Sequence, residues 1–530
     1  MVAAPEDEIP LPSSSTYDFF EQCPARVVNV FYSTSIRPED AMIHLTVPDT
    51  QVLVEKNDGI SKYTAFNIHV NGWFHTAVRF SQLWALSETI KHRFGLKYRG
   101  PPFPPKKLFN LNEKQLEERR LKLAKWLNGL VQHPEIVRHP TIEKWFLDAQ
   151  VSSFRATSIH ITLDIYLADG EKMIIKTNVD TPTNSVMKLL AQALNINGEI
   201  LLWSFGLFMV KSLDEGDRNS SNVLCVRLLR NFESPYISLQ QSNQKSAAQG
   251  IYHRLMLRKL IWDPRLEEAY LDNQEVTKLL YKQAKTDYIN RRFKALQASQ
   301  TEQLKSLERN NDHVRFLRMC HLQPSYSYEI LNDCTSKYPV DETKCRIKIG
   351  RRQIVLNFGA NYTEEAVFKA TRIRFWRISQ VDGQHIPTVF DFEYMTGKDS
   401  FQWISLQTDQ AVLLSLLFQS VGNEILHEYR NMSIEDQLAL NGGGCGMSMY
   451  LDPPKRQLEG RVSREEEPES STMSRTSSHS GLSIKTAKSA INDDPGMADL
   501  FESFNDVFTT ITDVLPHHNE AFANISNEDL

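Results

Sequence analysis

Three basic residues in the first third of the chain stand beside groups that suit phosphate chemistry. Arg79 is followed directly by Phe80, Lys106 closes a proline-rich stretch, and Arg119 lies within a helical pattern. An arginine fork binds a phosphate through two parallel hydrogen bonds, and a neighbouring aromatic ring offers a flat face to a sugar-like ring. The prolines hold Lys106 on a stiff, extended segment, where its ammonium group serves as a point charge for a second phosphate. Together these residues predict a pocket for one flat ring with at least two phosphates, although a solvated basic surface is the simpler interpretation of any one alone.

A hairpin and two helices are predicted to hold these side chains. Residues 64–70 alternate as a strand does, Asn71-Gly72 is a strong hairpin-turn signal, and residues 73–80 return as the partner strand. Helices are predicted over 81–94 and 111–130, because apolar residues recur there every three or four positions. The arginine–phenylalanine pair therefore falls where a strand meets a helix.

Composition and charge limit what the rest of the chain can do. The 530 residues carry a formal net charge of −5, so no global charge predicts nucleic-acid binding. The six cysteines form no Cys-x-x-Cys pair and no metal-ligand spacing, which is typical of reduced thiols, and we expect neither a metal nor a cofactor. The acidic start does not have the pattern of a signal peptide, and the longest apolar run, 411–421, is too short to span a bilayer. We therefore expect membrane contact only through a surface site.

Periodicity divides the chain into several modules, which predicts a multidomain α+β protein. We expect a disordered extension over 1–41 and the phosphate-binding module over 42–150. Residues 157–232 have the strand–hairpin–strand–helix order of a ubiquitin-like unit, 245–340 are predicted to be helical, and 345–430 form strands closed by one helix. The last pattern is typical of a phosphotyrosine-binding (PTB) or pleckstrin-like fold. Three basic residues of the helical module could add charge for membrane binding, but a solvated helix face is the favoured interpretation: Arg254, Arg258 and Lys259.

The strand predicted over 370–378 carries a tryptophan that could bind a partner. Strict alternation puts Ile373 and Phe375 on one face and Trp376 on the other, among arginines. If the first face is the core, the indole is exposed, and an exposed tryptophan commonly anchors a binding partner. A β-bulge that returns Trp376 to the core is the alternative.

The last hundred residues, 431–530, are predicted to be largely disordered, because much of this segment is rich in Ser, Thr, Glu and Arg. One apolar helical stripe, over 497–515, has no core of its own and should dock on another surface. Phe522 and Ile525 are spaced apolar anchors beyond it. The chain ends in three residues that combine acidic charge with an apolar side chain and a free carboxylate: Glu528, Asp529 and Leu530. A frayed acidic terminus is the alternative.

The three basic signals also carry a family resemblance. An Arg-aromatic-Ser triplet, a proline corner ending in lysine, and an arginine followed by Leu123 at +4 and Trp126 at +7 resemble a phox-homology (PX) domain. The resemblance implies a site for phosphatidylinositol 3-phosphate. It assigns four contacts: the 3-phosphate to Arg79, the inositol ring to Phe80, the 1-phosphate to Lys106 and the ring hydroxyls to Arg119.

The three later modules, in their order, resemble a FERM domain, and a PX domain directly before them resembles the PX–FERM sorting nexins. This implies that the third FERM module, residues 345–430, binds Asn-Pro-x-Tyr or Asn-x-x-Tyr motifs in the cytoplasmic tails of membrane receptors of the low-density-lipoprotein-receptor and integrin types. The peptide would add as a strand between the Trp376 strand and the closing helix, on which Phe418, Gly422 and Leu426 share a face. The family carries a larger apolar residue where Gly422 stands, so we expect a shallower groove wall.

The last twelve residues resemble the tail of one member of this group. That likeness implies recruitment of the Retriever recycling complex by Phe522, Ile525 and the terminal Glu-Asp-Leu. The whole resemblance implies a monomeric endosomal cargo adaptor without catalytic activity, shared between the cytoplasm and the early endosome membrane, which recycles receptors to the cell surface. A FERM-type linker between membrane and cytoskeleton is one alternative. An enzyme with an attached PX domain is another, although the sequence holds no hydrolase, kinase or nucleotide-binding motif.

Overall fold

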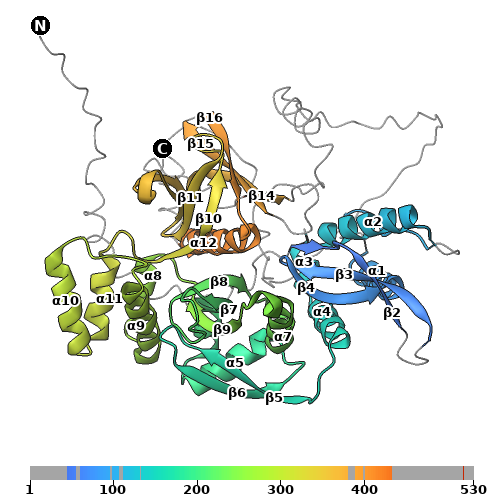
Figure 1. Cartoon of the computed structure of the whole chain (residues 1–530), viewed down its shortest axis with the longest axis horizontal. Coiled ribbons are helices and arrows are strands. Elements are labelled where there is room, and N and C mark those ends of the chain that lie inside the picture. The colour runs from blue at the N-terminus through green and yellow to red at the C-terminus, as the bar shows by residue number, and fades with distance from the viewer. Residues whose placement is uncertain are drawn as a thin grey trace, which may run out of the picture. The chain divides into compact units, whose positions relative to one another are not determined.

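The computed structural model describes residues 44–54, 60–95, 98, 100–106, 111–131, 133–379, 388–397, 400–431 and 517–518 (Figure 1). All of them belong to one of the two units into which the chain divides. Three predicted features lie outside the described residues: the extension over 1–41, the amphipathic helix over 497–515 and the C-terminal motif over 519–530.

The first module builds its sheet around a tight hairpin. β3 (Lys62–Val70) and β4 (Trp73–Arg79) are antiparallel, and Asn71 and Gly72 between them have φ angles of 53° and 81°, as a two-residue hairpin turn requires. The predicted hairpin is therefore confirmed. Two shorter strands flank β3 and four helices follow: β1 (Leu45–Thr46), β2 (Thr50–Val54), α1 (Phe80–Phe94), α2 (Glu113–Val131), α3 (Pro134–Val137) and α4 (Pro140–Ser153).

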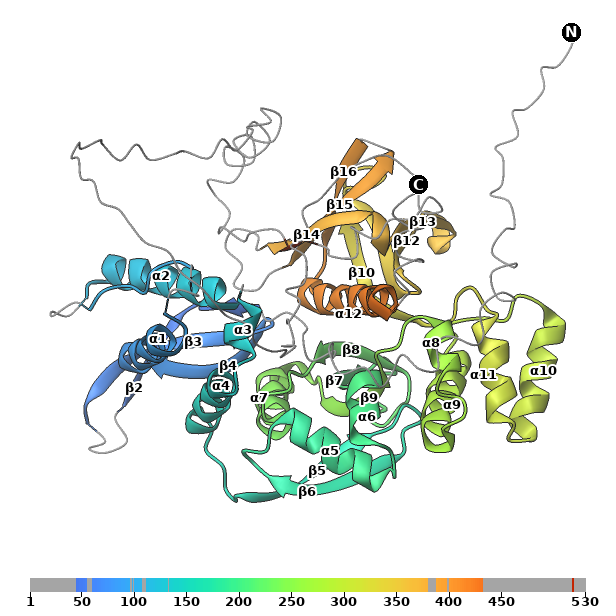
Figure 2. The same ribbon diagram turned by 180° about the vertical axis from the view of Figure 1, so that it is seen from behind.

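The second module is a mixed five-stranded sheet with the order β6-β5-β9-β7-β8, in which β5 and β9 are parallel (Figure 2). Its strands are β5 (His160–Tyr166), β6 (Lys172–Asn178), β7 (Phe205–Ser212), β8 (Val223–Leu228) and β9 (His253–Lys259). Its helices are α5 (Thr183–Ala193), α6 (Gly198–Ser204), α7 (Pro235–Ser246) and the 3₁₀ turn η5 (Ala247–Gln249). The apolar side of α5 is buried in the same core as the sheet, as the predicted ubiquitin-like order requires.

β9 corrects the predicted boundary between the second and third modules. This strand lies within the segment 245–340 that was predicted to be helical, yet it pairs with β5 and β7 in the ubiquitin-like sheet. All seven of its residues are buried, so the sequence shows no alternation and its basic residues resembled a solvated helix face. That interpretation is wrong: Arg254, Arg258 and Lys259 are only 2–5% exposed. Buried carboxylates meet two of these charges: Glu329 and Asp287 contact Arg258, and Glu267 contacts Lys259.

The third module is a small helical unit, shorter than predicted. Its helices are α8 (Pro264–Glu268), α9 (Gln274–Ile289), α10 (Ala298–Arg309) and α11 (His313–His321). The predicted range 245–340 overran it at the far end too, because the strand that begins at Tyr328 pairs with the sheet of the next module.

The last module is a long antiparallel sheet closed by one helix, α12 (Ala411–Asn431). Its strands are β10 (Tyr328–Ser336), β11 (Thr343–Gly350), β12 (Gln353–Phe358), β13 (Glu364–Lys369), β14 (Ile373–Ser379), β15 (Val389–Gly397) and β16 (Ser400–Gln407), with 3₁₀ turns η6 (Ala360–Tyr362) and η7 (Ala370–Arg372). They follow the order β13-β12-β11-β10-β16-β15-β14, and β17 (His517–His518) extends this order beyond β14. Leu414, Leu417 and Phe418 of α12 are buried in the core of this sheet, as the predicted PTB-like fold requires.

Buried contacts join the first module to the ubiquitin-like one. Phe232 of the second module lies in the core of the first, with its ring centroid 5.3 Å from that of Phe146. The amide of Gln150 at the end of α4 bridges the same junction, because it donates to Ser238 Oγ at 3.0 Å and accepts from the Ser234 N–H at 2.8 Å. The first module is thus packed against its neighbour through an apolar and a polar contact.

Candidate lipid and peptide sites

Arg79 is held at the point where β4 ends and α1 begins. Its backbone N–H donates to Gln82 Oε1 at 2.8 Å, which closes the first turn of the helix. Its guanidinium carbon lies 3.4 Å from the ring centroid of Tyr63 on β3. Arg79 pairs with Ala65 in the hairpin, so Tyr63 is its diagonal neighbour on the same face. Sequence reasoning did not include Tyr63, although this diagonal position on the predicted hairpin could have identified it.

An aromatic cluster gathers the other predicted lipid-binding residues. Arg119 lies over the ring of Phe80, with 4.2 Å from the guanidinium carbon to the centroid, and Lys106 Nζ lies 4.1 Å from the centroid of Trp84. Phe103 packs against both Phe80 and Trp84, at 5.4 and 5.7 Å. The structure therefore brings Phe80, Lys106 and Arg119 together on one cluster, next to Arg79 in the chain. Trp84 was missed, although it stands one helical turn after Phe80.

The electrostatics of this cluster favour an anion. Among the residues that the structure describes, neither Lys106 nor Arg119 forms an ion pair with a carboxylate. Partial burial lowers the pKa of Arg119 from its usual value, yet a guanidinium stays protonated at neutral pH. The neighbouring Arg120 is different, because it is paired with Glu117 and bonded to the carbonyl of Val47. Arg119 is thus the arginine of this pair that remains available to a ligand.

Trp376 occupies a different place from the one predicted. The register of β14 on β15 shifts between Ile373 and Phe375, and this bulge puts Trp376 on the same face as Ile373. The indole is 3% exposed, its Nε1–H donates to Ser415 Oγ at 3.1 Å, and its ring meets that of Phe418 with 5.0 Å between centroids. The prediction of an exposed anchor is therefore wrong, and the alternative of a bulge that buries the tryptophan is right.

The predicted groove residues on α12 also face the core. Phe418 is fully buried against Trp376, and Gly422 is buried one turn later, so these positions support β14 from beneath rather than line an open groove. The side chain of Leu426 lies outside the described residues. Two bonds from Trp262 hold this end of the helix: its backbone N–H donates to Glu424 at 2.7 Å, and its indole N–H donates to Ser420 at 2.8 Å.

The outer edge of β14 carries a strand from the far end of the chain. β17 pairs antiparallel with it, His518 opposite Phe375 and His517 opposite Trp376. This is the edge at which an added peptide strand was expected. Asn519 follows β17 directly in the sequence and Phe522 stands three residues further, so an Asn-x-x-Phe pattern begins where the pairing ends.

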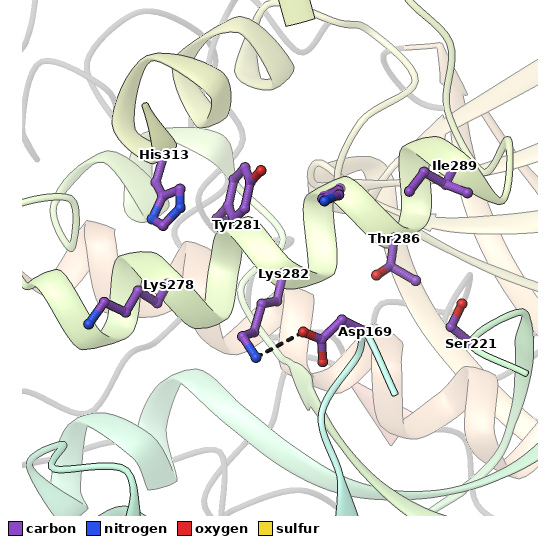
Figure 3. Close-up of a pocket in the computed structure, with 9 residues that line it drawn as sticks. Asp169, Ser221, Lys278, Tyr281, Lys282, Thr286, Ile289 and His313 are labelled. Atoms are coloured by element: carbon purple, nitrogen blue, oxygen red, sulfur yellow. Dashed lines mark ion pairs between the residues drawn. The ribbon is translucent and has the colours of Figure 1, made fainter. Parts of the chain in front are cut away.

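A cavity lined by several basic side chains lies elsewhere, along α9 (Figure 3). It measures about 420 Å³ and is lined by Asp169, Ser221, Lys278, Tyr281, Lys282, Lys285, Thr286, Ile289 and His313. Each of its lysines faces a carboxylate: Lys278 meets Glu275 at 2.9 Å, Lys282 meets Asp169 at 2.8 Å, and Lys285 meets Glu308 at 2.9 Å. The cavity therefore has no excess positive charge with which to hold an anion.

Metal-ligand clusters and membrane-spanning helices are both absent from the part of the chain that the structure describes. That part holds no group of three or more His, Cys, Asp or Glu side chains arranged to ligate a metal ion. It also holds no helix whose length and apolar character would suit it to cross a bilayer.

Comparison with known proteins matches three parts of the chain to family models. The PX domain model matches residues 66–150, the F1 lobe of the FERM domain of sorting nexins 17, 27 and 31 matches 161–262, and the sorting nexin 17 FERM C-terminal domain matches 327–426. The predicted order of a PX domain followed by a FERM domain is confirmed. The F1 match ends beyond β9, in agreement with the corrected boundary.

Relatives that match about three quarters of the chain agree with the family models. Sorting nexin-17 of Danio rerio is 31% identical over 421 residues, which cover 76% of this chain and 85% of that protein. Sorting nexin-17 of Homo sapiens is 28% identical over 417 residues, covering 76% and 86%, and sorting nexin-31 of Mus musculus is 25% identical over 427 residues, covering 78% and 93%. A solved myosin VII MyTH4-FERM domain of Dictyostelium discoideum aligns over 64% of this chain and 72% of its own, with 11% identity and a TM-score of 0.38. From the family models and the relatives, this chain belongs to the sorting nexin-17 family.

Proposed function

We propose that this protein is an endosomal sorting adaptor that joins a membrane lipid to the tails of membrane receptors. Its PX domain would bind phosphatidylinositol 3-phosphate, its third FERM module would bind Asn-Pro-x-Tyr or Asn-x-x-Tyr motifs, and its C-terminus would recruit the Retriever complex for recycling. Family membership supports the coarse role, a sorting adaptor at endosomes. The observation that carries the peptide-binding part is the pairing of β17 with β14, because it identifies an edge that accepts an antiparallel strand.

The PX site has chemistry suited to a phosphoinositide headgroup. Arg79 would hold the 3-phosphate with its fork, Lys106 would hold the 1-phosphate as a point charge, and Arg119 would bond the ring hydroxyls. Aromatic rings beneath these cations limit their motion, so less side-chain entropy is lost when the ligand binds. The ring of Phe80 would carry the inositol ring on the face that Arg119 does not cover.

The peptide site works through the backbone of β14. An antiparallel peptide strand would form main-chain hydrogen bonds along Phe375 and Trp376, as β17 does in this structure. The buried contacts of Trp376 with Ser415 and Phe418 keep the strand and α12 at a fixed spacing, so these residues position the groove and do not anchor the peptide. Gly422 extends the same packed layer.

A receptor peptide would have to displace the chain's own strand. β17 is tethered to α12 through residues 432–516, and the effective concentration of a tethered segment falls as its linker lengthens. Such a segment can hold the edge when no peptide is present and yield it to receptor tails that are concentrated on a membrane. Residues 519–530, the segment proposed to bind Retriever, follow β17 directly in the sequence.

Vesicle and peptide binding test this function together. The intact chain should sediment with vesicles that contain phosphatidylinositol 3-phosphate and should bind an Asn-Pro-x-Tyr peptide in solution, whereas a peptide with alanine in place of asparagine should bind weakly. Co-sedimentation with filamentous actin, together with no binding to either ligand, would favour the membrane–cytoskeleton linker instead. Turnover of a phospholipid or of a nucleotide would favour the enzyme alternative.

A further inference from the structure

Two cysteines of the third FERM module face each other across neighbouring strands. Cys334 on β10 and Cys345 on β11 are direct partners in the antiparallel ladder, and their Sγ atoms lie 3.3 Å apart. Both thiols are free, and both side chains are buried. The other two cysteines that the structure describes, Cys225 and Cys320, are also buried, but they do not form such a pair.

The backbone at this pair already suits a disulfide bond. Opposite residues in an antiparallel pair have Cα atoms about 4.5–5.5 Å apart, which falls inside the range of about 4.4–6.8 Å found in disulfides. To form a bond of about 2.05 Å, the sulfurs would need to approach by roughly 1.2 Å, a distance that side-chain rotation can cover. The register shift in this strand pair lies between Ile330 and Asp333, so the two cysteines face each other in a regular part of the ladder.

The two thiols differ in pKa. The hydrogen bond between them lowers the pKa of Cys345 and raises that of Cys334, so we assign the first attack on an oxidant to Cys345. The two cysteines are too far apart in the sequence to form a Cys-x-x-Cys motif, and the pairing of β10 with β11 brings them together.

We propose that Cys334 and Cys345 form a reversible oxidation site, at which a peroxide closes a disulfide between β10 and β11. The Cys345 thiolate attacks one peroxide oxygen, the O–O bond breaks, and a sulfenic acid forms while the leaving oxygen departs as water. The Cys334 sulfur then attacks the sulfenic sulfur, the S–O bond breaks, and a second water leaves. Two thiols and one hydrogen peroxide thus become one disulfide and two waters, and a dithiol reductant reverses the change.

The bond would stabilise the module without closing the peptide edge. Two strands, β16 and β15, separate β10 from β14 in the sheet, so the pair is remote from the strand that receives a peptide. The disulfide would close a short loop between two strands that share the core with α12, and this restricts the unfolded chain. We therefore expect oxidation to raise the melting temperature of the FERM domain and to leave peptide affinity unchanged.

Mass spectrometry of the full chain tests the site. The reduced protein is treated with hydrogen peroxide under native conditions, free thiols are alkylated, and the digest is searched for a peptide that links Cys334 to Cys345. Trypsin leaves Cys320 and Cys334 in one fragment, because no lysine or arginine separates them. A link between this fragment and Cys345 could therefore come from either cysteine. The C320A variant serves as the matched control, because only Cys334 remains in its fragment. In both wild type and C320A we expect the linked peptide in most molecules. The mass of the chain should fall by two hydrogens on oxidation, and dithiothreitol should restore it.

Single variants at the pair complete the test. C334S and C345S should give no linked peptide and no rise in melting temperature on oxidation. If either serine variant fails to fold, C334A and C345A replace it, since alanine buries no unpaired hydroxyl. Full alkylation of both cysteines in a folded, peroxide-treated wild-type chain would overturn the proposal, and so would a bond from either of them to Cys320 or Cys225.

Discussion

Trp376 offers the sharpest test of how the third FERM module is built. Its side chain is 3% exposed, bonds Ser415 and packs against Phe418. Replacement by alanine removes a buried aromatic side chain, which costs about 3–5 kcal/mol, and deprives Ser415 of that partner, which adds about 1 kcal/mol. Because the free energy of unfolding of a domain is typically about 5–15 kcal/mol, the W376A variant should lose a large part of it.

Thermal unfolding measures this loss directly. A change of 1 kcal/mol shifts the melting temperature of a domain of about 150–250 residues by about 2–4 °C, so W376A should melt about 10–20 °C below wild type. W403A is the matched control, because Trp403 on β16 is only half-buried and its ring stacks with Arg377 at 4.8 Å. Its loss should be smaller, because less of the Trp403 side chain is buried and a cation–π contact is worth about 0.5–2 kcal/mol. An unchanged melting temperature in W376A, or equal losses in both variants, would refute the core position of Trp376.

Three further predictions concern lipid, tail and acid. R79Q should weaken binding to vesicles with phosphatidylinositol 3-phosphate about tenfold to a hundredfold, because it removes a charge-assisted contact of about 1.5–3 kcal/mol. The control K122Q, at an exposed lysine, should bind as wild type does. Equal binding of R79Q and wild type would show that the pocket is misassigned. One glycine added after Leu530 should abolish recovery of Retriever from cells and spare lipid binding, because it moves the carboxylate off the leucine; unchanged recovery would return the tail to an ordinary frayed end. Burial lowers the pKa of His75 from 6.5 to about 4, so between pH 6.5 and 4 the unfolded chain binds a proton that the folded chain does not. The free energy of unfolding should therefore fall by about 3 kcal/mol from this residue as the pH drops from 6.5 to 4. A flat profile of unfolding free energy against pH in this range would contradict the burial of His75.

Local signals in the sequence predicted the parts of the fold that short-range chemistry determines. Asn71-Gly72 predicted the hairpin correctly, because few residues other than these adopt two successive positive φ angles. The residues predicted to bind lipid lie in or next to that hairpin and the helices after it, so they could be proposed from local sequence signals alone. Tyr63 and Trp84 lie one strand or one helical turn away, and they could have been found from the same predicted elements.

Features that depend on partners distant in the sequence could not be predicted in this way. β9 is buried on both faces, so its sequence does not alternate, and its basic residues resemble those of a solvated helix. Their partners Glu329 and Glu267 are distant in the sequence and become neighbours only in the fold. The bulge before Trp376 moves every later residue of the strand to the opposite face of the sheet. A prediction that assumes strict alternation cannot include such a bulge. The pairing of β17 with β14 joins segments more than a hundred residues apart along the chain.

Peptide binding with and without the chain's own end tests the central claim most directly. A fluorescent Asn-Pro-x-Tyr peptide would be titrated into the intact chain and into a chain that stops before residue 511, with unfolding curves to establish that both are folded. If the edge of β14 is the receptor site and β17 occupies it, both chains should bind the peptide and the shortened chain should bind it several-fold more tightly. Absence of binding to both folded chains would contradict the adaptor function, and equal affinity would contradict competition by β17.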